Sequence, residues 1–186
     1  MKKFKKIIAM GCAAVMAMSV MSMSAFATDD VSAVDYYTTY EDGANEDLPP
    51  ATDMSYAEVL DLINQKESSG IMLLTTQWYK NSPCMIPYNA DGHQGVRVGD
   101  FTTTDTETSV AFSVISYGGG TSYNYQLYKD NGSGKNPTPI GRYDTKNFGG
   151  GMSQSGLQKN TNYYFVISSD NVPADGANGA FTLTTY

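Results

Sequence analysis

The feature of this 186-residue chain that most constrains its fold is an alternation of apolar and polar side chains in four separate stretches. Successive side chains of a β-strand point to opposite faces of its sheet, so a period of two predicts strands with one buried and one wetter face. One side of these stretches is formed by Val110, Phe112, Val114, Tyr123, Tyr125, Leu127, Tyr163, Phe165, Ile167, Phe181 and Leu183, and the strand register decides which side faces the core.

Strong turn signals separate these stretches. They are Gly118–Gly120, Asp130–Gly132, Gly149–Gly151 and the loop from Asp170 to Gly179. Gly, Asn and Asp accept the backbone conformations of tight turns, so they mark the ends of strands. A further apolar, strand-prone run spans Ile71–Tyr79. Short strands joined by such turns predict a mainly β protein, an antiparallel β-sandwich or jelly-roll-like domain.

One short N-terminal helix is predicted ahead of the strands. Ser55 and Glu58 have the spacing of a capping box, in which each side chain accepts a hydrogen bond from the other residue's backbone N–H. Ser68–Gly70 ends the helix. Between them an apolar stripe follows the helical period, formed by Tyr56, Val59, Leu60 and Ile63. A single short helix is marginal alone, so we expect it to pack on the β domain.

Two segments precede this helix. Residues 1–27 combine a basic start, an uncharged apolar run and the ending Ala25-Phe26-Ala27, which predicts a cleaved signal peptide and secretion from a bacterial cell. An uncut membrane anchor and lipidation at Cys12 are weaker interpretations. Residues 28–53 carry eight acidic side chains and no Lys or Arg, which predicts a disordered acidic spacer before a helix-plus-sandwich domain at 54–186.

The charge excludes several partners. Cleavage after Ala27 removes four of the 12 basic residues and none of the 19 acidic ones, and so changes the formal net charge from −7 to −11. Nucleic acids and anionic membranes are bound through Lys/Arg patches, so neither is expected, nor is membrane insertion after cleavage. Cleavage also leaves Cys84 without a disulfide partner, and its apolar neighbours favour burial over cross-linking or catalysis.

Few side chains are available for catalysis. His93, the single histidine, lies in a Gly-flanked loop, and no Gly-x-Ser-x-Gly turn accompanies it. Most acidic residues of the β region lie beside Gly or Asn, where they close turns, so a two-carboxylate glycosidase site is a weaker interpretation. The sequence predicts no enzyme and no cofactor. Loops 130–133 and 170–178 carry oxygen ligands of the kind calcium takes, although their role as turns is favoured.

Aromatic side chains are the remaining sign of binding. All 14 tyrosines and Trp78 follow residue 27. Exposed aromatic rings form amphipathic platforms that suit sugar faces and protein contacts. The candidate ligand-binding residues are Tyr117, Tyr128, Tyr164 and Tyr186, and the strand register decides which of them are exposed.

Three motifs in the last eighty or so residues carry a family resemblance. They are Tyr125–Gly132, Asn160–Ile167 after Leu157, and Gly179–Leu183. With them the region of about residues 105–186 resembles the bacterial pre-peptidase C-terminal domain. The resemblance implies a jelly-roll-like sandwich and a non-catalytic accessory role beside a secreted enzyme.

These features together predict a secreted, non-catalytic binding module that recognises carbohydrate or other cell-surface material. Its expected partner is a polysaccharide or an extracellular or surface protein. Two alternatives stay open at this point: a protein-interaction or structural accessory of a secreted enzyme or surface complex, and a secreted hydrolase.

Overall fold

A computed structural model describes residues 34–35, 48–69, 77–89 and 94–186. The predicted signal peptide, most of the acidic segment and His93 lie outside the described residues. The described elements are β1 (Val34–Asp35), β2 (Thr52–Ser55), α1 (Tyr56–Ser69), β3 (Trp78–Ile86), β4 (Gln94–Thr102), β5 (Val110–Ser116), β6 (Ser122–Lys129), β7 (Thr138–Asn147), β8 (Gly150–Gln154), β9 (Asn162–Ser168) and β10 (Ala177–Thr185).

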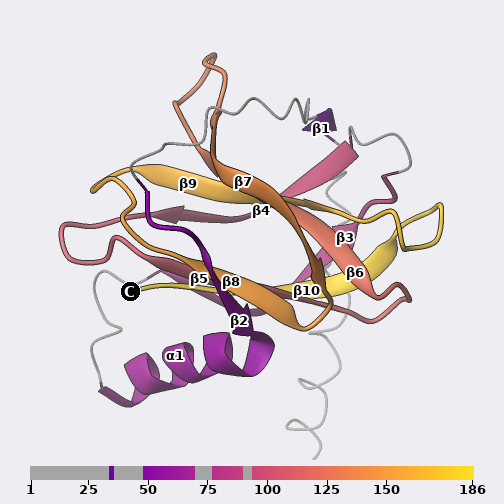
Figure 1. Cartoon of the computed structure of the whole chain (residues 1–186), viewed down its shortest axis with the longest axis horizontal. Helices are drawn as coiled ribbons and strands as arrows, with labels where there is room; N and C mark the ends of the chain where they lie inside the picture. The colour runs from indigo at the N-terminus through magenta and orange to yellow at the C-terminus, as the bar shows by residue number, and fades with distance from the viewer. Residues whose placement is uncertain (1–33, 36–47, 70–76, 90–93) are drawn as a thin grey trace, which may run out of the picture. The chain divides into compact units, whose positions relative to one another are not determined.

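The strands form two five-stranded sheets (Figure 1). The first sheet has the order β1-β4-β9-β6-β7 and the second has the order β2-β8-β5-β10-β3. All pairings between these strands are antiparallel. The two sheets pack face to face, since the ring of Phe112 on β5 stacks on that of Phe165 on β9 with 4.0 Å between centroids. The prediction of a mainly β antiparallel sandwich with one short helix is confirmed.

The hydrophobic core lies between the sheets. The eleven residues that form one side of the alternating stretches all belong to its main cluster of buried side chains. Other members come from strands that the alternation did not identify, among them Val96, Val98, Phe101, Ile140 and Met152. Burial of apolar surface is the dominant favourable contribution to folding, and Cys84 is a free cysteine.

Helix α1 begins as predicted, at a capping box. The Ser55 N–H donates to Glu58 Oε2 at 2.7 Å and the Glu58 N–H donates to Ser55 Oγ at 3.3 Å. The backbone and side-chain hydrogen bonds from Ser55 lower the pKa of Glu58. Val59 and Ile63 are fully buried, because the helix packs on the outer face of the second sheet (Figure 1). Residues of that outer face are buried as well: Ala111, Ser113, Thr182 and Thr184.

A half-buried ion pair fixes the C-terminal half of α1 to the sandwich. Lys66 Nζ lies 2.9 Å from Glu107 Oε1 and also donates to the Thr185 carbonyl oxygen. The Thr185 hydroxyl donates to Glu107 Oε2 at 2.7 Å. Glu107 therefore links the helix to the end of β10, and both its carboxylate oxygens are engaged in structure.

Two predicted boundaries were wrong. The strand expected to end at Tyr79 continues as β3 to Ile86; residues 71–76 lie outside the described part. Pro83 disfavours a continued strand in a sequence-based prediction, because proline lacks a backbone donor. However, β3 is at the edge of its sheet, where proline is tolerated. Gly150 and Gly151, expected in a turn, begin β8. A Cβ on Gly151 would lie 2.2 Å from the Phe112 carbonyl oxygen, so this glycine permits close strand contact.

The folded unit also reaches into the segment predicted as a spacer. Val34 and Asp35 pair with β4 as β1, and β2 begins at Thr52 rather than after residue 53. Ahead of β2, Leu48 packs against the core and the Pro49 carbonyl oxygen accepts a hydrogen bond from Gln154 at 2.9 Å. Among the described residues, no helix has the length and apolar character needed to cross a membrane.

Candidate functional site

A bulge in β4 creates the most distinctive surface of the sandwich. Val98 pairs with Phe165 and Phe101 pairs with Tyr163, so β4 carries one residue more than β9 in this interval. The bulge contains Gly99, whose φ of +63° lies in the left-handed region that favours glycine. In a regular strand Arg97 and Asp100, three positions apart, would point to opposite faces. The extra residue brings the two side chains to the same face.

Arg97 holds two carboxylates together on that face. Its Nε donates to Asp100 Oδ1 at 2.8 Å, and a terminal nitrogen donates both to Asp100 Oδ1 and, at 2.7 Å, to Asp130 Oδ2. The guanidinium carbon lies 3.8 Å from the ring centroid of Tyr164, which places the cation over the ring. Burial alone would lower the pKa of Arg97, but the hydrogen bonds to Asp100 and Asp130 outweigh it and raise the pKa.

We expect Arg97→Met to raise the pKa of Asp130. The Arg97 hydrogen bond is the largest cause of the lowered pKa of this carboxyl, followed by a hydrogen bond from the Gly132 backbone N–H. A lowered folded-state pKa means that the stabilisation is present at neutral pH and is lost as the pH falls through that pKa. NMR titration of the Asp130 carboxyl measures the shift. Urea unfolding at stepped pH should show wild type and variant converging in acid, and an unchanged Asp130 pKa would contradict this assignment.

A shallow hollow of about 390 Å³ adjoins this charged group, lined by Gln77, Trp78, Tyr79 and Asp100. It lies where edge strand β3 of the second sheet meets β4 of the first. Two hydrogen bonds join the strands there: the Tyr79 hydroxyl donates to the Asp100 carbonyl oxygen at 2.8 Å, and the Thr102 N–H donates to Gln77 Oε1 at 2.7 Å. Burial, with a smaller contribution from Asp100, raises the pKa of Tyr79.

The hollow combines a partly exposed aromatic residue with open polar atoms. Trp78 is 40% exposed, although it is the largest side-chain type. Within the described residues, Asp100 Oδ2, the Gln77 amide nitrogen and the Trp78 indole nitrogen have no hydrogen-bond partner. The site therefore offers a flat ring, one charged acceptor and two donors to a ligand. Sequence reasoning did not select Trp78, because nothing in its neighbourhood showed whether it faces in or out.

Two of the four tyrosines predicted to bind ligand are buried. Tyr128 and Tyr164 are 6% and 2% exposed, and the prediction that their rings form an exposed platform is wrong. They are direct partners across β6 and β9, and their rings stack with centroids 5.6 Å apart. With Val166 they form a small cluster on the face of the first sheet opposite the main core. The Tyr164 ring of this cluster lies beneath the guanidinium of Arg97.

The other two tyrosines lie far from each other. Tyr117 is 67% exposed and follows the last residue of β5, where its N–H donates to the Asn178 carbonyl oxygen at 2.8 Å. Tyr186 follows the last residue of β10, and its hydroxyl is hydrogen-bonded to that of Ser153. Because β5 and β10 are antiparallel, the two residues lie at opposite ends of the pair, roughly 25 Å apart. The structure does not bring the four candidates together.

The loops considered for calcium act as turns. Asp130 Oδ1 accepts a hydrogen bond from the Gly132 N–H at 2.8 Å, as in an Asx turn. In the other loop, Asn171 Oδ1 accepts hydrogen bonds from the N–H and hydroxyl of Thr121. Among the residues that the structure describes, no group of three or more His, Cys, Asp and Glu side chains could hold a metal ion.

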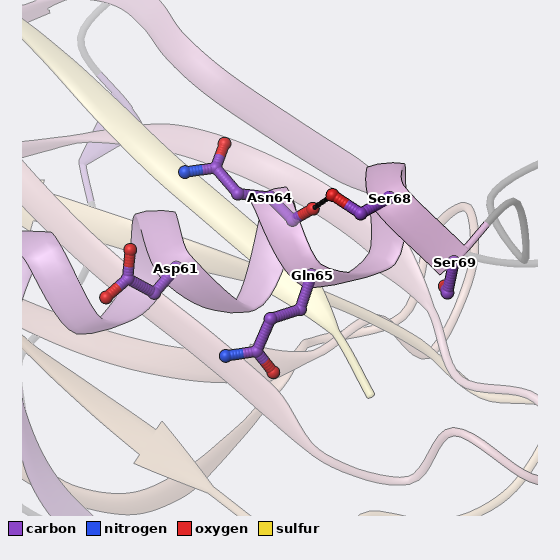
Figure 2. A pocket seen from close by; sticks show the side chains of 5 residues that line it. All are labelled: Asp61, Asn64, Gln65, Ser68 and Ser69. Atoms are coloured by element: carbon purple, nitrogen blue, oxygen red, sulfur yellow. Dashed lines mark hydrogen bonds between the residues drawn. The ribbon is translucent and has the colours of Figure 1, made fainter.

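A second hollow, on α1, is lined by residues with polar side chains. It is lined by Asp61, Asn64, Gln65, Ser68 and Ser69 (Figure 2). Figure 2 shows the Ser68 hydroxyl turned back onto the helix, where it donates to the Asn64 carbonyl oxygen at 2.8 Å. The Asn64 side-chain oxygen accepts a hydrogen bond from Lys80 Nζ at 3.1 Å. Without an aromatic side chain, this surface has the character of a solvated helix face.

Cys84 packs against the core, and burial raises its pKa to about 12. The thiolate is the reactive form, so this thiol is poorly suited to nucleophilic catalysis or disulfide exchange. We expect Ellman's reagent at pH 8 to modify Cys84 at least about tenfold more slowly in the native protein than in urea. Non-reducing electrophoresis should show no Cys84-linked dimer. Equal rates in the two conditions would contradict burial of the thiol.

No family model and no curated protein matches the chain, so the resemblance to the pre-peptidase C-terminal domain stays a prediction. Among solved structures, the Yersinia pseudotuberculosis-derived mitogen matches with 8% identity and a TM-score of 0.38, over 60% of this chain and 86% of the mitogen. A family 11 carbohydrate-binding module from Clostridium thermocellum, in complex with a β-1,3-1,4-mixed-linked tetrasaccharide, matches with 12% identity and a TM-score of 0.25, over 61% of this chain and 89% of the module. At these scores neither likeness carries an argument about function.

Proposed function

We propose that this protein is an exported, non-catalytic β-sandwich that binds carbohydrate, with a sugar ring stacked on Trp78. The observation that carries the proposal is the hollow at β3 and β4, where a half-exposed indole lies beside the open carboxylate edge of Asp100. The N-terminal 27 residues, with their basic start, apolar run and cleavage pattern, support export.

The chemistry of the hollow fits a sugar. A pyranose presents an apolar C–H face that packs on an aromatic ring and a rim of hydroxyls that need both donors and acceptors. Asp100 Oδ2 accepts from a hydroxyl, and the Gln77 amide nitrogen and the Trp78 indole donate to others. The hydrogen bonds from Tyr79 and Thr102 fix the two strands before the ligand arrives, which lowers the ordering cost of binding.

The same groups are poorly arranged for hydrolysis. Asp100 and Asp130 do converge, but on the guanidinium of Arg97. A glycosidase needs one carboxyl whose raised pKa keeps it protonated as the general acid. The pKa of Asp130 is lowered, which favours the opposite protonation state. This supports binding over catalysis.

The test is a glycan array and an insoluble-polysaccharide pull-down with the chain lacking residues 1–27. We expect wild type to bind at least one glycan, and Trp78→Ala to weaken that binding by roughly tenfold or more, since loss of one stacking contact is worth about 1.4 kcal/mol or more. Met85→Ala is the control, because Met85 is exposed on the same strand but pairs with Asn178 at its other end.

Two results would overturn the proposal. One is a blank array and pull-down for the folded wild-type protein. The other is binding that survives Trp78→Ala but is lost in Tyr117→Ala, which would place the ligand at the opposite end of the second sheet.

A further inference from the structure

We infer that this site selects uncharged glycans and rejects carboxylated or sulfated ones, with Arg97 acting as the positioning residue that aims Asp100 at a ligand hydroxyl. This inference rests on the proposed function and specifies its substrate class. Three observations carry it: the local negative charge, the hydrogen-bond partners of the nearby lysines, and the orientation of the Asp100 carboxylate that the β4 bulge imposes.

The local charge is negative. Arg97 is the single cation of the group, and its guanidinium is paired with the carboxylates of both Asp100 and Asp130. Two negative charges therefore face one positive charge. The Asp100 side chain is 55% exposed, and Asp100 is the one charged residue among those that line the hollow. An anionic sugar at this position would meet a carboxylate rather than an available cation.

The other described cationic side chains near the site form hydrogen bonds with other residues. Lys80, two positions after Trp78, reaches Asn64 and Glu67 of α1. Lys129, one position before Asp130, donates to Gln158 Oε1 at 2.8 Å. Lys80 is therefore paired with an acidic side chain of the protein itself, and the ammonium of Lys129 is held on a neutral amide. The formal charge of the whole chain, −7, opposes an anionic polymer as well.

The bulge explains why the carboxylate is held open. Arg97 Nε and a terminal nitrogen of Arg97 both donate to Oδ1 of Asp100, and Arg97 makes no hydrogen bond to Oδ2. Two donors on one oxygen fix the side-chain rotamer of Asp100 before binding. A neutral sugar hydroxyl can then donate to Oδ2 without displacing any existing hydrogen bond.

The experiment uses matched pairs of soluble polymers in affinity electrophoresis: hydroxyethyl cellulose with carboxymethyl cellulose, arabinoxylan with glucuronoxylan, and methyl-esterified with de-esterified polygalacturonate. Within a pair that the protein binds, we expect the affinity for the neutral polymer at low salt to be roughly tenfold or more above that for the charged polymer. This difference in affinity, here called the gap, should become smaller as salt screens the repulsion. Asp100→Asn should narrow the same gap at low salt. Asp175→Asn, which removes an exposed carboxylate from the loop before β10, is the charge-matched control and should leave the gap unchanged.

The failures of the two proposals can be told apart. If the charged polymer of a pair binds as tightly as the neutral polymer or more tightly, and salt weakens that binding, the inference is overturned while the proposed carbohydrate binding stands. A gap that is the same in wild type and in a folded Asp100→Asn variant also overturns it. Absence of binding to every polymer and to the glycan array overturns the proposed function, and the inference with it.

Discussion

Phe112→Ala is expected to lower the free energy of unfolding by about 3–5 kcal/mol, the range seen when a large buried aromatic side chain is truncated. Phe112 is fully buried on β5, which lies between β8 and β10 in the second sheet. Its ring stacks on Phe165 of the opposite sheet at 4.0 Å and also contacts Tyr125 and Phe181. Truncation therefore removes the contact that joins the layers and leaves a cavity between them.

Urea unfolding monitored by tryptophan fluorescence measures this loss, and Tyr117→Ala is the matched control. Tyr117 is an aromatic residue at the end of the same strand and is 67% exposed, so its truncation should change stability by less than about 0.5 kcal/mol. A loss below about 1 kcal/mol for Phe112→Ala would mean that the two sheets do not depend on this contact.

The fold could be predicted from sequence where a strand has one apolar face. In β5, β6, β9 and β10 apolar and polar side chains alternate cleanly, and one side of each alternation lines the core. The helix was predictable for a similar reason, because Ser55 and Glu58 make a local capping signal whose partners are only three residues apart. Local periodicity is visible in one sequence without knowledge of tertiary contacts.

The strands that sequence reasoning missed are those whose pattern is broken by an edge or a bulge. In β4, Val96 and Val98 face the core but the next inward residue is Phe101, because Gly99 and Asp100 occupy the bulge. In β3, Pro83 disfavours the prediction of a strand. A second bulge separates the pairs Phe181–Ser82 and Leu183–Tyr79. An odd number of inserted residues reverses the face of everything beyond it, so a fixed period of two fails.

The candidate site was not predictable for the same reason. Its parts, Gln77, Trp78, Asp100, Arg97 and Asp130, come from three separate segments and meet through register shifts. The tyrosine prediction failed at Tyr128 and Tyr164 because alternation identifies which face a residue lies on but not what covers that face. Trp78 lies on the edge strand β3, and its exposure could not be read from the sequence around it.

Gly99→Ala should lower the free energy of unfolding by about 2–4 kcal/mol, because two costs add. The first is the left-handed backbone conformation at φ +63°. The second is steric: an added Cβ would lie 2.8 Å from Leu183 Cδ1 and 3.3 Å from Phe181 Cε2, both core side chains of β10. Thermal and urea unfolding measure the total.

Gly132→Ala separates the two costs. Gly132 has φ +87°, also left-handed, but no heavy atom lies within 4 Å of an added Cβ, so only the backbone cost of about 1–2 kcal/mol should remain. The excess loss in Gly99→Ala is then the packing cost of the β4 bulge. Relief of that clash must move the bulge away from β10, and Asp100 moves with it, so glycan binding by the folded Gly99→Ala protein should fall while that of Gly132→Ala is retained. Equal losses of stability in the two variants would show that the core yields to the methyl group, and would contradict a mechanical link between the bulge and the orientation of Asp100.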